Sequence, residues 1–334
     1  MNRILLILTL CLGLSGCGNA NTANTTASGG NAAGKMFVGV SFLSLQPALY
    51  TAWEGKAAHR IHRVHRFFDF NMAASGNNNI WTEVGASLTA GYSVMLTLEP
   101  TFGDNYTSML PQIINGSLDP YIDAHIAGIK TLQAAWPAAD IWMRFGHEMN
   151  GDWYPWGGLN GHNANTAQNY IDAFQHVVTR FRNAGLPAAM VKWVWSPNVW
   201  TTDNFSAYYP GDPYTDMISV SGFNFGPNTT LHPALVWESF NTIHKFTYDT
   251  LTTLHPNLPY FIGGVSSAES GGSKGAWIDD MTVQLLNGYP NMAGIFWFNV
   301  DKSGAGEANW TIDSSPASLA AVQRMYTTAK LWQR

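Results

Sequence analysis

Eight short apolar segments, spaced along the whole chain, form the clearest pattern in the sequence. They are rich in valine, isoleucine, phenylalanine and tryptophan, and they lack the strict alternation of a half-exposed strand. Continuous runs of this kind are typical of parallel strands that are buried on both faces. The predicted strands cover residues 37–43, 61–70, 93–100, 141–150, 191–198, 217–226, 260–267 and 293–300.

Segments with helical periodicity separate these strands. The clearest covers residues 166–183, where apolar residues recur on one face until Gly185, a typical helix C-cap, precedes Pro187. The alternation predicts an α/β fold, a (β/α)8 TIM barrel, as one domain over residues 36–334. A doubly wound open sheet is the competing fold, but the sequence lacks the glycine-rich phosphate loop expected after an early strand. The other predicted helices lie near residues 122–135, 235–254, 274–286 and 318–332.

The first 17 residues have the features of a targeting segment. A charged start is followed by an apolar stretch, residues 4–14, that is too short to span a bilayer stably. Residues 14–17 read Leu-Ser-Gly-Cys, which resembles a bacterial lipobox and predicts a lipidated Cys17; an ordinary signal peptide is the alternative. Because residues 18–34 contain no large apolar side chain, we expect a flexible tether over residues 18–35. The predicted location is the bacterial cell envelope, on its periplasmic or outer surface, through a lipid anchor.

Composition narrows the classes of partner. The net charge is −5, and no run of lysine and arginine is long enough to follow a phosphate backbone, so nucleic acid is not expected. The second cysteine, Cys11, lies in the removed segment, which leaves the folded domain without a thiol ligand, and we expect no metal and no cofactor. Aromatic residues reach 13%, a content that suits sugar stacking and a tryptophan-rich core equally.

Candidate chemistry gathers at the end of the fourth predicted strand. Residues 143–157 read Met-Arg-Phe-Gly-His-Glu-Met-Asn-Gly-Asp-Trp-Tyr-Pro-Trp-Gly. Catalytic residues of such barrels lie at the C-terminal ends of strands, and here a carboxylate, an imidazole and an amide are followed at once by aromatic rings. This combination suits a sugar site, with an acid for the glycosidic oxygen, polar groups for hydroxyls and rings for stacking. A buried polar cluster without function is the alternative interpretation.

The sequence resembles glycoside hydrolase family 26, the mannanase and lichenase type of retaining β-glycanase. The His-Glu-Met-Asn-Gly string at 147–151 and the Trp-Tyr-Pro-Trp-Gly string at 153–157 are highly specific to it. The resemblance extends over residues 36–334, and further strings that support it lie at 98–100, 209–212, 221–224, 266–278 and 296–299.

The resemblance implies a role for several residues. Glu148 would be the general acid/base, and His147 and Asn150 would orient it or bind the sugar. Trp297 would form the floor of the subsite at the cleaved bond. We also expect sugar contacts from Trp153 and Trp156.

The sequence departs from the family pattern at the position of the second carboxylate. A retaining glycosidase needs a nucleophile about 5–5.5 Å from the acid. The family places it at the end of strand seven in a string like Ile-Gly-Glu-Val, whereas residues 262–265 read Ile-Gly-Gly-Val. Gly264 therefore stands where the nucleophile should be. An engineered variant, a natural glycan-binding pseudoenzyme and a sequence error all remain open.

Other carboxylates are candidates for the second group, namely Glu99, Glu269 and Asp301, in an inverting geometry of about 6.5–9.5 Å. Glu99 either binds substrate or pairs with Arg144 across the barrel top. Phe223 stands where many relatives carry a tyrosine near the nucleophile, which removes one hydroxyl group from the expected site.

Two further motifs are set aside. His59, His62 and His65 cannot converge on a metal from one strand, because His62 points away from the other two. Residues 271–275 match Gly-x-Ser-x-Gly, but this serine-hydrolase turn must follow a strand directly, and we expect Lys274 to begin a helix instead.

Two function classes stay open. The first is an endo-acting hydrolase of β-mannan or mixed-linkage β-glucan, and the second is a catalytically disabled, lectin-like surface lipoprotein on the same barrel. A polysaccharide or oligosaccharide is the expected partner in both, and the membrane is contacted only through the lipid anchor.

Overall fold

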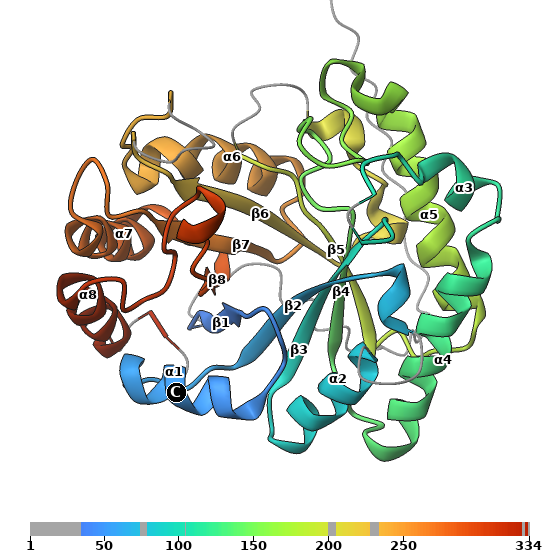
Figure 1. Cartoon of the computed structure of the whole chain (residues 1–334), viewed down its shortest axis with the longest axis horizontal. Helices are drawn as coiled ribbons and strands as arrows, with labels where there is room; N and C mark the ends of the chain where they lie inside the picture. The colour runs from blue at the N-terminus through green and yellow to red at the C-terminus, as the bar shows by residue number, and fades with distance from the viewer. Residues whose placement is uncertain are drawn as a thin grey trace, which may run out of the picture.

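The structure is a computed structural model that describes residues 35–73, 79–103, 105–199, 205–227, 234–328 and 331–332. Eight parallel strands close into a barrel in chain order, from β1 to β8. Figure 1 shows the helices arranged around the outside of these strands. The predicted (β/α)8 TIM barrel is confirmed. The predicted signal peptide, Cys17 and residues 18–34 of the tether lie outside the described residues.

The strands match the predicted apolar runs but are generally shorter. The fourth strand ends at Phe145 and not, as predicted, at Asn150, so Glu148 lies on the loop that follows the strand. The bounds are β1 Phe37–Ser41, β2 Arg63–Asp69, β3 Ser93–Glu99, β4 Ile141–Phe145, β5 Val191–Trp195, β6 Met217–Asn224, β7 Tyr260–Ser267 and β8 Met292–Phe298.

Five of the eight helices described start at a side-chain N-cap: Asn79, Thr166, Ser239, Ser273 and Ser315. Thr166 caps the clearest predicted helix and forms a reciprocal capping box with Asn169. Within the described ranges, no helix combines the length and the apolar character needed to cross a membrane. The bounds are α1 Pro47–Ala57, α2 Ile80–Thr89, α3 Leu110–Ile114, α4 Asp119–Ala135, α5 Ala167–Asn183, α6 Phe240–Leu254, α7 Lys274–Gly288 and α8 Pro316–Thr327.

The interior of the barrel is closed at the bottom by apolar side chains. The ring of Phe37 packs against Trp142 at 5.3 Å and Phe296 at 5.4 Å between ring centroids. Gly39 and Gly294 make room for this cluster, because a Cβ at either would approach an aromatic ring to 2.4 Å. The interior is thus a packed core and not a pore, as in other barrels of this type.

A polar layer lies above this apolar cluster. His65 hydrogen-bonds Ser41 and Thr97, each at 2.8 Å, and Arg144 Nε donates to Thr97 Oγ1 at 2.7 Å. Arg144 Nη1 also donates to the Gly263 carbonyl. These bonds join β1, β2, β3, β4 and β7, and they fix the strand ends that carry the candidate site.

Strand β7 carries an extra residue at Gly264. Its pairing with β6 shifts between Ile262 and Val265, and its pairing with β8 shifts between Gly263 and Val265. Such a bulge bends the strand and re-aims a side chain, and bulges are common beside active sites. A bulge at this position turns residue 264 out of the regular alternation of the strand.

Candidate active site

Glu148 lies on a strained turn directly above β4. Its φ of 55° is in the left-handed region, which a residue other than glycine adopts only where its surroundings impose it. Its backbone N–H donates to the Ser196 carbonyl at 2.7 Å, which fastens the turn to the end of β5. The carboxyl group accepts a hydrogen bond from Trp153 Nε1 at 2.8 Å, and the residue is 8% exposed. The turn therefore holds one nearly buried carboxyl group at the barrel mouth.

Burial raises the pKa of Glu148. Hydrogen bonds from Trp153, Ser221 and Asn198 and the charge of Arg144 oppose this rise but do not cancel it. A carboxyl group with a raised pKa keeps its proton closer to neutral pH, which is the property that a general acid needs.

The two polar neighbours of Glu148 are engaged by the protein. Asn150 and Asn198 bond reciprocally, with Asn150 Nδ2 donating to the Asn198 carbonyl at 2.9 Å and Asn198 N donating back at 2.8 Å. His147 Nε2 hydrogen-bonds the Tyr154 hydroxyl at 3.1 Å, and burial holds the pKa of His147 well below its usual value, so its ring is neutral. Both side chains are buried, and the geometry therefore supports orientation of the Glu148 turn over direct sugar binding.

The aromatic side chains divide into two groups. Trp153 is 41% exposed beside Glu148, so its ring is available for stacking. Trp156 and Trp297 are 1% and 0% exposed, so their rings are covered in this structure, and their contact with sugar stays a prediction. Trp156 stacks on Tyr154 at 4.6 Å, and Trp297 Nε1 donates to the Trp310 carbonyl at 2.9 Å. Their rings belong to the packing beneath the site.

Gly264 lies on the bulge of β7, between the ends of β6 and β8. A Cβ built at Gly264 would lie 3.4 Å from Phe298 Cβ and 3.6 Å from Phe223 Cζ, which are ordinary contacts. Phe223 and Phe298 are both half-buried at the ends of β6 and β8. Ser221, which hydrogen-bonds Glu148, also donates to the Gly263 carbonyl at 3.3 Å. One side chain thus links Glu148 to the bulge, and the space at position 264 accepts a Cβ without a close contact.

Among the other carboxylates, Glu99 lies close enough to Glu148 for the charge of Glu148 to act on it. It ends β3, which neighbours β4, and its pKa is raised to about 7 by burial and by the charges of Asp69 and Glu148, against the effect of Arg144. No ion pair joins Glu99 to Arg144 in the described part of the chain, so the expected pairing is limited to attraction at longer range. Glu99 therefore stands beside the acid and not across the barrel from it.

Glu269 and Asp301 stabilise loops. Glu269 accepts a hydrogen bond from Ser314 Oγ at 2.7 Å, and Asp301 accepts from the backbone N and the Oγ of Ser303 at 3.0 and 2.7 Å. Both side chains are exposed, which makes them poor candidates for a second catalytic carboxylate.

Glu307, which lies on the loop after β8, is a residue of the site that was not predicted from the sequence. It pairs with Lys302 and accepts a hydrogen bond from Trp310 Nε1 at 3.2 Å. Burial raises the pKa of Tyr154, and the charges of Glu148, Glu99 and Glu307 add to this rise, so the loop of Glu307 reaches the mouth. An acidic residue three positions before Trp310, behind the last strand, is the signal that could have indicated it.

The motifs that were set aside have other partners. His65 lies in the polar layer of the barrel, His62 Nδ1 accepts from Val38 N at 3.0 Å, and His59 stacks on Tyr326. Ser273 is the N-cap of α7, and α7 begins at Lys274 as predicted. In the described ranges, no three histidine, cysteine, aspartate or glutamate side chains are grouped to hold a metal ion.

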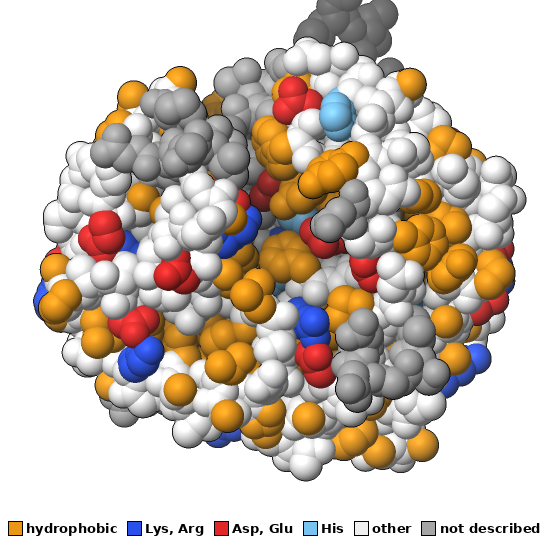
Figure 2. Space-filling model, viewed as in Figure 1, with side chains coloured by type: hydrophobic (Ala, Val, Ile, Leu, Met, Phe, Trp, Pro, Cys, Tyr) orange, Lys and Arg blue, Asp and Glu red, His pale blue; other side chains and the backbone are white. Residues whose placement is uncertain are grey.

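Figure 2 shows this face of the molecule hollowed near its centre, where acidic, basic, histidine and hydrophobic side chains meet. The fold and the site define a class of protein: a (β/α)8 barrel with a buried carboxyl group on the turn after β4 and aromatic rings around it. Comparison with known proteins gives the family.

The model of glycosyl hydrolase family 26 matches residues 104–246. Endoglucanase H of Acetivibrio thermocellus is 35% identical over 263 residues, which are 77% of this chain and 26% of that protein. Mannan endo-1,4-beta-mannosidase A and B of Caldalkalibacillus mannanilyticus is 28% identical over 140 residues, which are 38% of this chain and 26% of that protein. The chain thus spans about a quarter of the length of these two relatives.

A family 26 β-mannanase structure from Bacteroides ovatus matches with a TM-score of 0.66 at 12% identity, covering 89% of this chain and 90% of that one. At 12% identity this match supports the barrel fold alone. The chain belongs to glycoside hydrolase family 26.

Proposed function

We propose that this chain is built as an endo-acting β-glycan hydrolase whose general acid/base is Glu148. The observation that carries the proposal is a nearly buried carboxyl group with a raised pKa, held on a strained turn at the barrel mouth. The similarity to an endoglucanase and to a mannan endo-β-mannosidase supports mixed-linkage β-glucan or β-mannan as the substrate class.

Glu148 would supply the acid for the first step of a retaining reaction. Glu148 would donate its proton to the glycosidic oxygen as the bond to the leaving sugar breaks. Position 264 would supply the carboxylate that attacks the anomeric carbon from the opposite face, but Gly264 has no side chain. The covalent intermediate cannot form here, and we expect slow turnover of ordinary glycans.

The missing side chain at Gly264 favours a second candidate function. Trp153 and the half-buried Phe223 and Phe298 leave aromatic surface at the mouth, so a glycan can bind without being cut. In that case the protein would be a lectin-like member of a hydrolase family. Turnover separates the two functions.

A polysaccharide panel, run on the chain and on Gly264→Glu side by side, tests both. Binding is followed by affinity electrophoresis and cleavage by release of reducing ends, with β-mannan, mixed-linkage β-glucan and β-1,3-xylan. Binding by both proteins with fast cleavage only by Gly264→Glu is the expected result. Absence of binding to every glycan would contradict both functions.

The proposal also includes attachment of the protein to the cell envelope through a lipid on Cys17. Metabolic labelling with a fatty-acid probe should label the chain and should not label Cys17→Ala. Labelling that persists in Cys17→Ala would contradict the anchor and leave the proposed activity untouched.

A further inference from the structure

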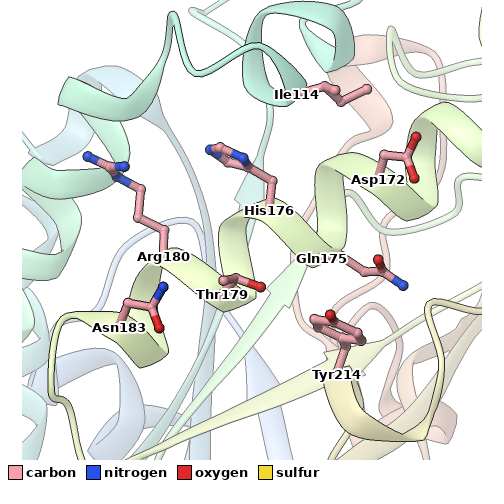
Figure 3. Close-up of a pocket in the computed structure, with 8 residues that line it drawn as sticks. All are labelled: Ile114, Asp172, Gln175, His176, Thr179, Arg180, Asn183 and Tyr214. Atoms are coloured by element: carbon pink, nitrogen blue, oxygen red, sulfur yellow. The ribbon is translucent and has the colours of Figure 1, made fainter.

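A groove on the outer wall of the barrel lies away from the mouth. It runs along α5, between α3 and the segment that carries Tyr214, and Figure 3 shows its lining side chains. Its volume is about 450 Å³, which lies within the range of small-molecule sites. Ile114 lies on one side of α5 and Tyr214 on the other.

Helix α5 contributes a row of polar side chains to this groove: Asp172, Gln175, Thr179 and Asn183. Their spacing of three or four residues places them on one face of the helix. Gln175 Nε2 donates to the Pro210 carbonyl at 2.8 Å, which fixes the amide and leaves its oxygen as an acceptor. In the described part of the chain, the side chains of Thr179 and Asn183 have no hydrogen-bond partner. The row therefore offers both donors and acceptors to a ligand.

The charged groups beside this row compensate each other. Arg180 donates to both oxygens of Asp123, at 2.7 and 2.6 Å, and to Asp119 at 2.6 Å. His176 Nε2 lies 2.6 Å from the other oxygen of Asp119. This network ties α5 to α4 and holds the side chains in place. Because no uncompensated cation faces the groove from this network, an anionic ligand such as a phosphate gains little there.

Tyr214 supplies an aromatic surface at the edge of the groove. The Arg182 guanidinium lies 5.9 Å from the centre of its ring and donates to the neighbouring Pro213 carbonyl. These contacts hold the ring in position, and Tyr214 is only half-buried. A fixed ring beside amide, hydroxyl and carboxylate groups is the combination that binds neutral sugars, through their C–H faces and hydroxyl groups.

We propose that this groove is a second glycan-binding site, which takes a neutral segment of the same β-glycan that the mouth binds. The proposal rests on the proposed function for the identity of the glycan. A polysaccharide held at two places on one chain leaves more slowly than one held at the mouth alone, because release of one site does not release the polymer.

Affinity electrophoresis in gels that contain mixed-linkage β-glucan or β-mannan tests the proposal. The variants are Tyr214→Ala at the groove, Trp153→Ala at the mouth and the double variant. Phe246→Ala, an exposed ring on α6, is the matched control. Thermal unfolding of each variant verifies that the fold is intact. We expect Tyr214→Ala to weaken binding about tenfold, Phe246→Ala to leave it unchanged, and the double variant to bind more weakly than either single variant.

The outcomes separate the groove from the mouth. Weaker binding in Trp153→Ala together with full binding in Tyr214→Ala overturns the groove and keeps the proposed function. A chain that neither polysaccharide retards overturns both. Calorimetry with a β-glucan hexasaccharide gives an independent reading, with two sites per chain expected and one site contradicting the proposal.

Discussion

Restoring a carboxylate at position 264 is the most informative change to this protein. In Gly264→Glu, the new Cβ would meet its nearest neighbours at 3.4 to 3.6 Å, and the backbone there does not need glycine. The side chain would extend from the bulge between Phe223 and Phe298. Below it lies Arg144, a buried cation that has no ion pair within the described ranges and whose pKa is lowered to about 10, so it stays protonated. A carboxylate beside this cation gains a favourable partner.

The effect on rate should be large, because nucleophile and acid act as a unit. Loss of one member of such a unit removes nearly all of its contribution, so we expect Gly264→Glu to raise kcat by at least about 10³-fold, or ~4 kcal/mol of barrier. The assay is release of reducing ends from mixed-linkage β-glucan and β-mannan, with the anomer of the product followed by NMR. Retention of configuration is expected.

Gly264→Gln is the matched control, since its side chain has the same shape but cannot attack. Equal rates for Gly264→Glu and Gly264→Gln would refute the assignment of position 264. So would fast turnover by the unaltered chain that Gly264→Glu does not improve. Either result would make Glu99 or Glu307 the candidate for the second catalytic carboxylate.

Three further changes test the surroundings of the site. Trp153→Phe removes a hydrogen bond that opposes the raised pKa of Glu148, so the pKa of Glu148 should rise further. NMR titration of a carbon-labelled Glu148 carboxyl group measures this pKa. An unchanged or lower value would contradict the contact between Trp153 and Glu148. Trp297→Ala removes a fully buried ring and should lower the free energy of unfolding, measured by urea titration, by about 3–5 kcal/mol. A variant that keeps its stability but binds glycan more weakly would instead indicate that Trp297 stacks on the sugar. Glu99→Gln should flatten the pH dependence of the free energy of unfolding. Because the pKa of Glu99 is raised to about 7 in the folded state, its contribution to stability is full below the unfolded pKa and declines as pH rises through 7, by roughly 2 kcal/mol after allowance for partial exposure. Parallel stability curves for the two proteins would contradict this.

The fold could be predicted because its signals are local. Continuous apolar runs occur eight times with amphipathic segments between them, and capping residues such as Thr166 and Ser273 mark helix starts. The position of Glu148 followed from the rule that strand ends carry chemistry. The end of β4 at Phe145 was less predictable, because the turn depends on a hydrogen bond from Glu148 N to the carbonyl of Ser196, directly after β5.

The remaining features of the site depend on contacts between distant segments. Tryptophan is a residue type that stacks on sugars, and only the contacts of Trp156 with Tyr154 and of Trp297 with Trp310 show that these two rings are buried. The bulge at Gly264 arises from the registers of three strands and leaves no mark in the local sequence. Glu307 belongs to no motif, and Ser221 lies in the 221–224 string without a role predicted for it; tertiary structure brings both to the mouth.

Azide rescue tests most directly the central claim that Glu148 protonates the leaving oxygen while position 264 faces the opposite side of the sugar. With an aryl β-glycoside and the unaltered chain, azide would occupy the space beside Gly264 and attack the anomeric carbon as the aryl oxygen leaves with the Glu148 proton. The account predicts an azide-dependent rate and an α-glycosyl azide as the product by NMR, with both lost in Gly264→Gln. A rate that azide does not change, or a β-glycosyl azide, would contradict it.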